Sequence, residues 1–172
     1  MKILVLVMAA LVLAVPVGAN PESITMGPYT VSFDLGYMGG YSITTEQSEK
    51  ETLYGIPVTD YMTTIQGASP TQVIWLSVKE FRPTMEVEYD TMGAMSDGLK
   101  SLSFQCGEPI IIPRTIDGKL GALGSTSCAG GFSVQGILYP LDTPNEVVII
   151  FSGYPWDEGT SNLVKTIHVE KS

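Results

Sequence analysis

The stretch CGEPIIIPRTIDGKLGALGSTSC, residues 106–128, contains both cysteines of the chain and two strand-like arms around an Asp-Gly turn signal. This pattern predicts a β-hairpin. A two-residue loop would pair residues whose numbers add to 235, whereas a three-residue loop, Ile116–Gly118, would pair residues whose numbers add to 234, as those of Cys106 and Cys128 do. Because Gly118 can adopt the left-handed conformation that a three-residue loop requires, the sequence favours the longer loop. The two cysteines then lie opposite each other, where a non-hydrogen-bonded pair can form a disulfide bond.

The first arm of this hairpin has the features of a sheet edge. Pro109 and Pro113 are four residues apart, so both missing N–H groups fall on the same edge of the strand. Prolines on an exposed edge oppose pairing with other chains, and a disulfide would stabilise the hairpin by about 3 kcal/mol through loop entropy. A redox switch is the alternative, but Cys-x-x-Cys is absent, and paired cysteines in an exported chain are usually structural.

The first 19 residues have the pattern of a secretory signal peptide. Lys2 precedes an apolar run over residues 3–15, and the small residues up to Ala19 suit cleavage before Asn20. A retained membrane anchor is the alternative, which the shortness of the run and Pro16 disfavour. We therefore expect residues 1–19 to be removed and residues 20–172 to form one secreted domain, without a membrane span.

Alternation of apolar and polar residues predicts strands through most of this domain. The runs are residues 29–35, 41–45, 52–56, 60–65 and 72–81 before the hairpin, and 132–139 and 146–152 after it. In the run 72–81, Trp75 lies on the face opposite to three alternating apolar residues. This pattern predicts a strand that is covered on both faces.

A period of three to four residues predicts two helices. One long amphipathic helix follows Pro83, with Thr84 as its N-cap and an apolar stripe that ends at Leu102. A short C-terminal helix begins near Thr160 and ends near Glu170. The order of elements predicts an α+β domain, with both helices packed on one antiparallel sheet.

The charge of the chain limits its partners. It has 18 acidic and 9 basic residues and a net charge of −9 at pH 7. Such a surface repels phosphate backbones and anionic lipid headgroups, so nucleic acid is disfavoured as a partner. Neutral, basic or metallic partners are compatible with it.

The sequence predicts no catalytic residues, no metal site and no cofactor. The only histidine, His168, lies near the end of the chain, and no G-x-S-x-G motif accompanies it. One histidine and two bonded cysteines leave too few ligands for zinc. Calcium at residues 142–146 or 157–158 is an alternative, although each segment offers only two acidic residues. No spacing of carboxylates argues for glycoside hydrolysis.

Two similar pentapeptides supply the candidate contact residues. YPLDT begins at Tyr139 and YPWDE at Tyr154, and each closes a predicted strand. Ordinary turn chemistry accounts for both. A large aromatic side chain at a bend is available to a partner, so Trp156 is the best single candidate, with Tyr154, Tyr139 and Asp157 as further partner or ligand contacts.

The order of elements, with GPYTVSFDLG at residues 27–36 and VVIIFSGYPWDEGTSNLVKTIHVEK at 147–171, resembles the fold of the photosystem II extrinsic protein PsbP and its relatives. The signal sequence and the stretches 116–125 and 154–171 are also similar to small exported proteins of methanogenic archaea that have no assigned activity. The resemblance implies a PsbP-like α/β sandwich that works at the cell envelope, and it transfers no functional residue.

These observations favour a non-enzymatic interaction or accessory domain with a protein partner at the cell envelope. The alternative is an extracytoplasmic protein that binds a small molecule or a cation in a pocket between sheet and helix, with Tyr139 or Trp156 at its mouth. A carboxylate-dependent hydrolase is the least favoured hypothesis.

Overall fold

Two antiparallel sheets and two short helices make up the part of the chain that the computed structural model describes, which is residues 21–36, 40–46, 48–53, 56–82, 90–102, 105–142, 145–153 and 157–172. The predicted signal peptide lies outside these residues. The elements in chain order are β1 (Pro21–Met26), β2 (Tyr29–Asp34), β3 (Ser42–Thr45), β4 (Glu49–Leu53), β5 (Ile56–Gln66), β6 (Val73–Phe81), α1 (Thr91–Lys100), β7 (Ile110–Ile116), β8 (Lys119–Cys128), β9 (Phe132–Pro140), β10 (Glu146–Gly153), α2 (Asp157–Thr166) and β11 (His168–Lys171).

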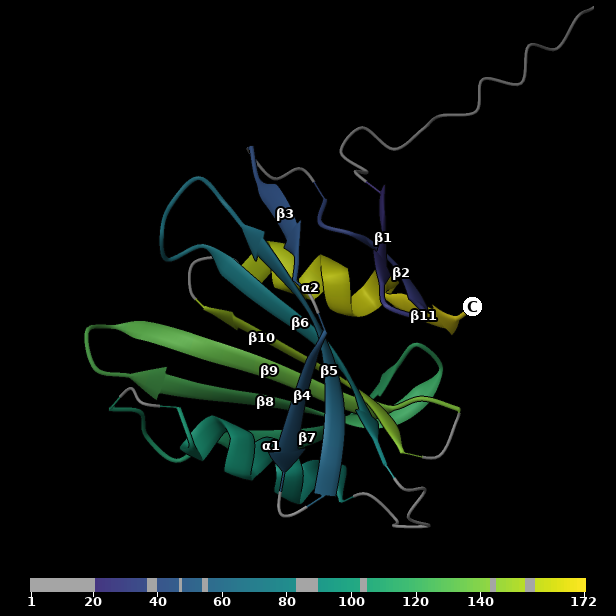
Figure 1. Cartoon of the computed structure of the whole chain (residues 1–172). Helices are drawn as coiled ribbons and strands as arrows, with labels where there is room; N and C mark the ends of the chain where they lie inside the picture. The colour runs from purple at the N-terminus through teal and green to yellow at the C-terminus, as the bar shows by residue number, and fades with distance from the viewer. Residues whose placement is uncertain are drawn as a thin grey trace, which may run out of the picture.

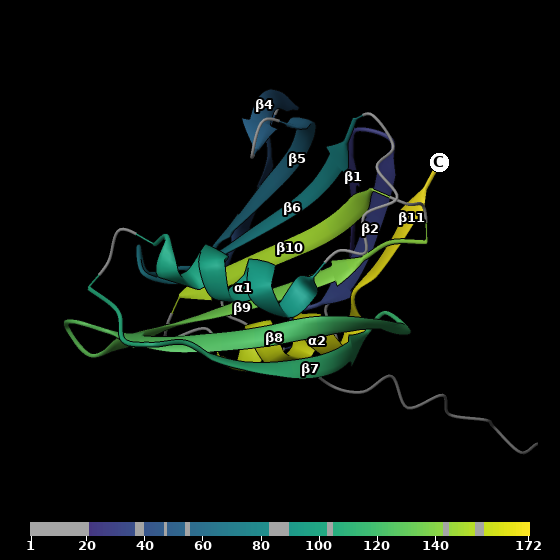
Figure 2. The same cartoon turned by 90° about the horizontal axis from the view of Figure 1, so that it is seen from below.

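The large sheet separates two layers (Figures 1 and 2). Its strand order is β3-β5-β6-β10-β9-β8-β7, and β4 also pairs with β5. On one side, α1 packs against β7, β8 and β9, and on the other side lie α2 and the small sheet β1-β2-β11. The main core joins the large sheet to the small sheet and α2. A second core joins α1 to β8 and β9.

The alternation that predicted the strands places their apolar side chains in these cores. In β2, Tyr29, Val31 and Phe33 are buried while the residues between them are half-buried. The runs beginning at residues 41, 60, 72, 132 and 146 are confirmed as parts of β3, β5, β6, β9 and β10. β1 was not predicted, and the run predicted at 52–56 is displaced to β4 at Glu49–Leu53.

The predicted α+β class, with one long amphipathic helix on a single sheet, is wrong. Strands contain 60% of the described residues and helices 15%, and there are two sheets. α1 is only ten residues long, and its N-cap is Asp90, whose carboxylate accepts a hydrogen bond from the Gly93 N–H at 2.9 Å. The predicted N-cap Thr84 lies outside the described residues. Local periodicity did not reveal the second sheet, because its pairing joins the two ends of the chain.

The C-terminal segment shows this most clearly. The helix predicted to continue to Glu170 ends at Thr166, and residues 168–171 form β11, which pairs with β2. Val169 lies opposite Val31, and both side chains are buried in the main core. Burial against a strand at the other end of the chain therefore overrides the local helical pattern.

Two glycines allow α1 to lie close to the sheet. Gly124 of β8 and Gly136 of β9 are cross-strand partners on the α1 side. A methyl group at Gly136 would lie 2.7 Å from the sulfur of Met95, and one at Gly124 would lie 2.5 Å from a terminal carbon of Leu99. Larger residues at these positions would hold the helix away from the sheet.

Candidate functional site

The hairpin turn differs from the prediction. Ile116 pairs with Lys119 and Ile110 with Ser125, so the loop has two residues and the paired numbers add to 235. Asp117 and Gly118 have φ angles of 50° and 72°, as a two-residue turn with two left-handed residues requires. The predicted three-residue loop is therefore wrong, although the cysteine pairing that suggested it is correct.

The disulfide joins Cys106 to Cys128 with a Cα–Cα distance of 3.9 Å. The two residues form an antiparallel bridge outside the regular ladder. Between this bridge and the pair Ile110–Ser125, the first arm has three residues, 107–109, and the second has two, 126–127. The extra residue is a β-bulge, which reconciles the two registers.

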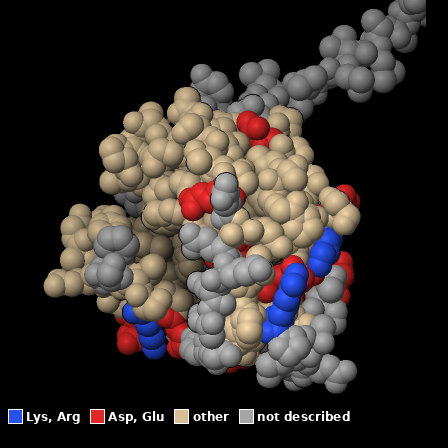
Figure 3. All heavy atoms as spheres, viewed as in Figure 1, with Lys and Arg blue, Asp and Glu red and all other residues tan. Residues whose placement is uncertain are grey.

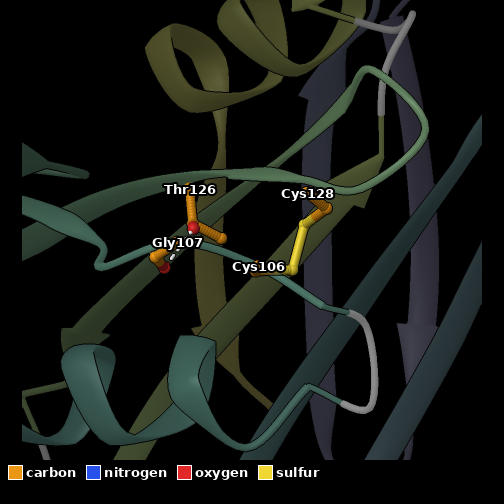
Figure 4. Close-up of a disulfide and its surroundings, with 4 residues drawn as sticks. All are labelled: Cys106, Gly107, Thr126 and Cys128. Carbon is orange, nitrogen blue, oxygen red and sulfur yellow. Dashed lines mark hydrogen bonds between the residues drawn. A yellow bond between two sulfur atoms is a disulfide. The ribbon is translucent and has the colours of Figure 1, made fainter.

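Hydrogen bonds fix the bulged segment against β8. The Gly107 N–H donates to the carbonyl oxygen of Ser127 at 2.9 Å, and the Ala129 N–H donates to that of Gln105 at 2.8 Å. These bonds flank the cysteines, which are therefore the expected non-hydrogen-bonded pair. The Thr126 hydroxyl donates to the Gly107 carbonyl at 2.8 Å (Figure 4). The disulfide and these bonds together hold residues 107–108 as a wall beside β8.

β7 is an edge strand of the large sheet. In a two-residue hairpin the residues that flank the turn are hydrogen-bonded, so Ile116 and every second residue before it bond to β8. Pro113 belongs to the other set, and its missing N–H falls on the free edge. The predicted edge position of this arm is therefore confirmed, and Pro113 lies on the free edge, whereas Pro109 lies in the bulge outside the regular ladder.

A groove lies on the sheet face between this wall and β9. Its volume is about 310 Å³. It is lined by Gly107, Glu108, Ile110, Ser125, Thr126, Ser127, Ser133 and Gln135. The groove is on the main-core face of the sheet, because Ile112 pairs with Leu123 and Leu123 with the core residue Ile137. Of the described helices, α2 packs on β2 and β10, and Ile110 and Ile112 are exposed on this part of the face.

Four polar side chains form the floor of the groove. Ser125 of β8 pairs with Gln135 of β9, and Ser127 pairs with Ser133. Paired residues share a face and lie about 5 Å apart, and alternate residues of one strand lie about 7 Å apart. The four residues therefore occupy the corners of a rectangle of these dimensions. We call them the polar rectangle.

Two isoleucines of β7 form an apolar rim beside the polar rectangle. Ile110 is 70% exposed and Ile112 is 47% exposed, and both point to the face that carries the groove. Ile110 is the direct cross-strand partner of Ser125. The surface therefore combines an exposed aliphatic contact with neutral hydrogen-bonding groups.

The groove carries little net charge, although the chain is strongly acidic. Among the described residues that line it, only Glu108 is ionisable, and its carboxylate lies 3.1 Å from the ammonium group of Lys100. On the face seen in Figure 3, the Lys and Arg side chains lie in the lower half, beside Asp and Glu side chains. At the groove, the charge of Glu108 is therefore offset by that of Lys100.

A second polar cluster holds β11 to the hairpin turn. His168 Nδ1 lies 2.8 Å from an oxygen of Asp117, and Nε2 lies 3.0 Å from one of Glu170. The other Asp117 oxygen accepts a hydrogen bond from the Val169 N–H at 3.1 Å. The hydrogen bonds to Asp117 and then to Glu170 raise the pKa of His168. His168 thus lies on a strand, where it anchors the end of the chain.

A third cluster holds the other end of β11. Lys171 pairs with Glu146, whose side chain is only 3% exposed, and its ammonium group lies 3.8 Å from Glu80. The hydrogen bond to Glu146 raises the pKa of Lys171. The same ammonium group lies 5.4 Å from the ring centre of Tyr29. Burial, followed by the charge of Glu146, raises the pKa of Tyr29. These groups are structural clamps on the last strand.

The predicted contact residues do not form one site in the described structure. Tyr139 is fully buried in the main core, so its predicted role at a pocket mouth is wrong. Burial, and then the charge of Asp117, raise its pKa. Tyr154 and Trp156 lie outside the described residues. Asp157 begins α2, and its side chain also lies outside them.

The acidic segments considered for calcium do not form a metal site among the described residues. Of the acidic residues at 142–146, Glu146 pairs with Lys171 and Asp142 lies 3.4 Å from Lys119. Within the described ranges, no group of three or more His, Cys, Asp or Glu side chains could hold a metal ion. No described helix is long and apolar enough to cross a membrane.

Sequence reasoning missed several exposed apolar residues. Trp75 is 41% exposed, so the prediction that β6 is covered on both faces is wrong. Ile110 and Ile112 were assigned only to a hairpin arm. The serines at 125, 127 and 133 are the signal that could have located the groove, because they alternate on strands where the core pattern requires apolar residues.

No protein-family model, curated protein or solved structure matches the chain. The resemblance to PsbP and to exported archaeal proteins therefore stays a prediction, and the case for function depends on the surface described above.

Proposed function

We propose that the protein is an exported, non-enzymatic interaction domain that binds a component of the cell envelope through the part of the face of β7, β8 and β9 that carries the groove. The observation that carries this proposal is the pair Ile110 and Ile112. They are exposed at 70% and 47% on one face, beside a groove with neutral polar groups. An apolar contact bordered by hydrogen-bonding groups is the composition of an interaction surface.

The rigidity of this surface supports the proposal. The disulfide and the Thr126–Gly107 hydrogen bond fix one wall, and the floor belongs to two paired strands. A binding surface on rigid elements loses little conformational entropy when a partner binds. Pro113 on the free edge disfavours strand addition as the binding mode, so contact through the face is favoured.

The export part of the proposal has two supports. The disulfide is typical of oxidising compartments, and the N-terminal sequence has the pattern of a signal peptide. The non-enzymatic part is supported by the groove itself. The described residues that line it include no histidine, no cysteine and no carboxylate pair, which are the groups that general acid–base and nucleophilic catalysis use.

The test is the native size of the protein in its own envelope, after gentle cross-linking under non-reducing conditions. We expect a discrete complex for the wild type and its loss in the double variant Ile110→Ser/Ile112→Ser. The matched control is Leu120→Ser, because Leu120 is also 70% exposed but points to the other face of the sheet. A monomer for the wild type, or a complex that survives the double substitution, would contradict the proposal.

A further inference from the structure

We propose that the groove between residues 107–108 and β9 binds a neutral saccharide, so that the envelope component is a glycan. This inference rests on the proposed function, because it assigns the chemistry of the partner at the same face. Its structural basis is the juxtaposition of the polar rectangle with the exposed side chain of Ile110.

The polar rectangle matches the chemistry of a sugar ring. Three corners are the hydroxyl groups of Ser125, Ser127 and Ser133, each of which can both donate and accept hydrogen bonds, and the fourth is an amide. Sugar hydroxyls have the same dual character. The corner spacings of about 5 and 7 Å, which follow from strand geometry, are comparable to the width of one pyranose with its hydroxyl groups.

The apolar rim supplies the second element of such a site. A pyranose has C–H groups on its ring faces, which need an apolar surface when they leave water. Ile110 lies beside Ser125 and is 70% exposed, so it can cover one side of the ring. The groove volume of about 310 Å³ is at the lower end of the range for small-ligand sites and suits one or two sugar units.

Charge selects a neutral ligand over an anionic one. Among the described residues that line the groove, Glu108 is the only ionisable one, and the ammonium group of Lys100 lies 3.1 Å from its carboxylate. Within the described part of the chain, no cationic side chain lines the groove to hold a carboxylate, sulfate or phosphate. The net charge of −9 disfavours anionic ligands further. A peptide ligand would engage the same isoleucines, and the experiment below separates it from a saccharide.

The experiment is a titration of the purified, disulfide-bonded protein, followed by the backbone amide resonances in NMR. The probes are maltose, cellobiose, lactose and diacetylchitobiose, together with the neutral saccharides released from the native envelope by mild hydrolysis. Glucuronic acid and a neutral tetrapeptide are the comparison ligands. We expect saturable shifts confined to residues 107, 108, 110, 125–127 and 133–135 with at least one neutral saccharide, and none with glucuronic acid.

Variants test the assignment to the rectangle. We expect Ser127→Ala/Ser133→Ala to weaken saccharide binding at least tenfold and Ile110→Ala to weaken it severalfold. The control Ser42→Ala, an exposed serine on β3 at the other edge of the sheet, should bind as the wild type does. The amide spectra verify that each variant is folded.

Two results would overturn the inference. One is the absence of saturable shifts with every neutral saccharide, and the other is undiminished binding by the double serine variant. If the saccharides fail while the isoleucine-dependent complex in the envelope persists, the surface is an interaction site for a protein. If both fail, the proposed function fails with the inference.

Discussion

Removal of the disulfide should destabilise the domain through the unfolded chain. The bond joins residues 22 positions apart, and the loop-entropy model assigns about 3 kcal/mol to a loop of this length. With a urea m-value of about 2 kcal/mol/M, the variant Cys106→Ser/Cys128→Ser should unfold at a midpoint about 1.5 M lower. The m-value itself should rise, because the unfolded chain without the bond exposes more surface.

The measurement is equilibrium unfolding in urea, followed by tryptophan fluorescence and by circular dichroism. Wild-type protein treated with a thiol reductant is the control and should unfold at the same midpoint as the variant. A midpoint shift below about 0.5 M would refute the entropic argument. If the urea midpoint shifts by the full amount of about 1.5 M while the m-value stays unchanged, the lost stability belongs instead to the folded state, at the wall that residues 107–108 form.

Three further predictions concern the clamps and the helix. Replacing Lys171 with Met should lower the free energy of unfolding in urea by about 2 kcal/mol, because it leaves the nearly buried carboxylate of Glu146 without its ion-pair partner. The double variant Lys171→Met/Glu146→Gln should recover part of this stability. Equal stability of the wild type and the single variant would contradict the role of Lys171 as a clamp. The folded state raises the pKa of His168 above its unfolded value, so the contribution of the protonated imidazole to folding stability is complete below about pH 6.5 and is lost as pH rises through the folded pKa. Because the side chain is half-exposed, this loss of stability should be below about 1 kcal/mol. In a series of melting temperatures measured against pH, His168→Ala should abolish the decrease that this loss causes. Gly136→Ala should cost about 1–3 kcal/mol, because the new methyl group would lie 2.7 Å from the sulfur of Met95. Gly118→Asn should cost less, because open space surrounds this turn residue and asparagine tolerates the left-handed conformation. Thermal melts that rank the two variants in the opposite order would refute the packing argument.

Local chemistry explains what the sequence predicted well. The Asp117-Gly118 signal, the cysteine pair and the alternation in β2 each depend on neighbours within a few residues or across one turn. The two hairpin registers conflicted because each local signal was correct at its own end. Only the bulge at residues 107–109 reconciles them, and a bulge has no sequence signature of its own.

Long-range pairing explains what the sequence missed. β11 pairs with β2 across most of the chain length, so a local helical pattern suggested a helix up to Glu170 instead. Tyr139 resembled a turn residue because a proline follows it, but its strand lies in the centre of the large sheet, and the side chain is buried. The groove depends on which part of the sheet α2 leaves uncovered, a property of the packed layers.

The most direct test of the central claim is site-specific photo-cross-linking in the native envelope. A photoreactive phenylalanine analogue would replace Ile112 in one sample and Leu120 in another, because both side chains are exposed but lie on opposite faces of the same hairpin. We predict a discrete species cross-linked to an envelope glycan from position 112 and none from position 120. Equal labelling at both positions, or a species from position 120 alone, would contradict the assignment of the interaction surface to the groove face of β7, β8 and β9.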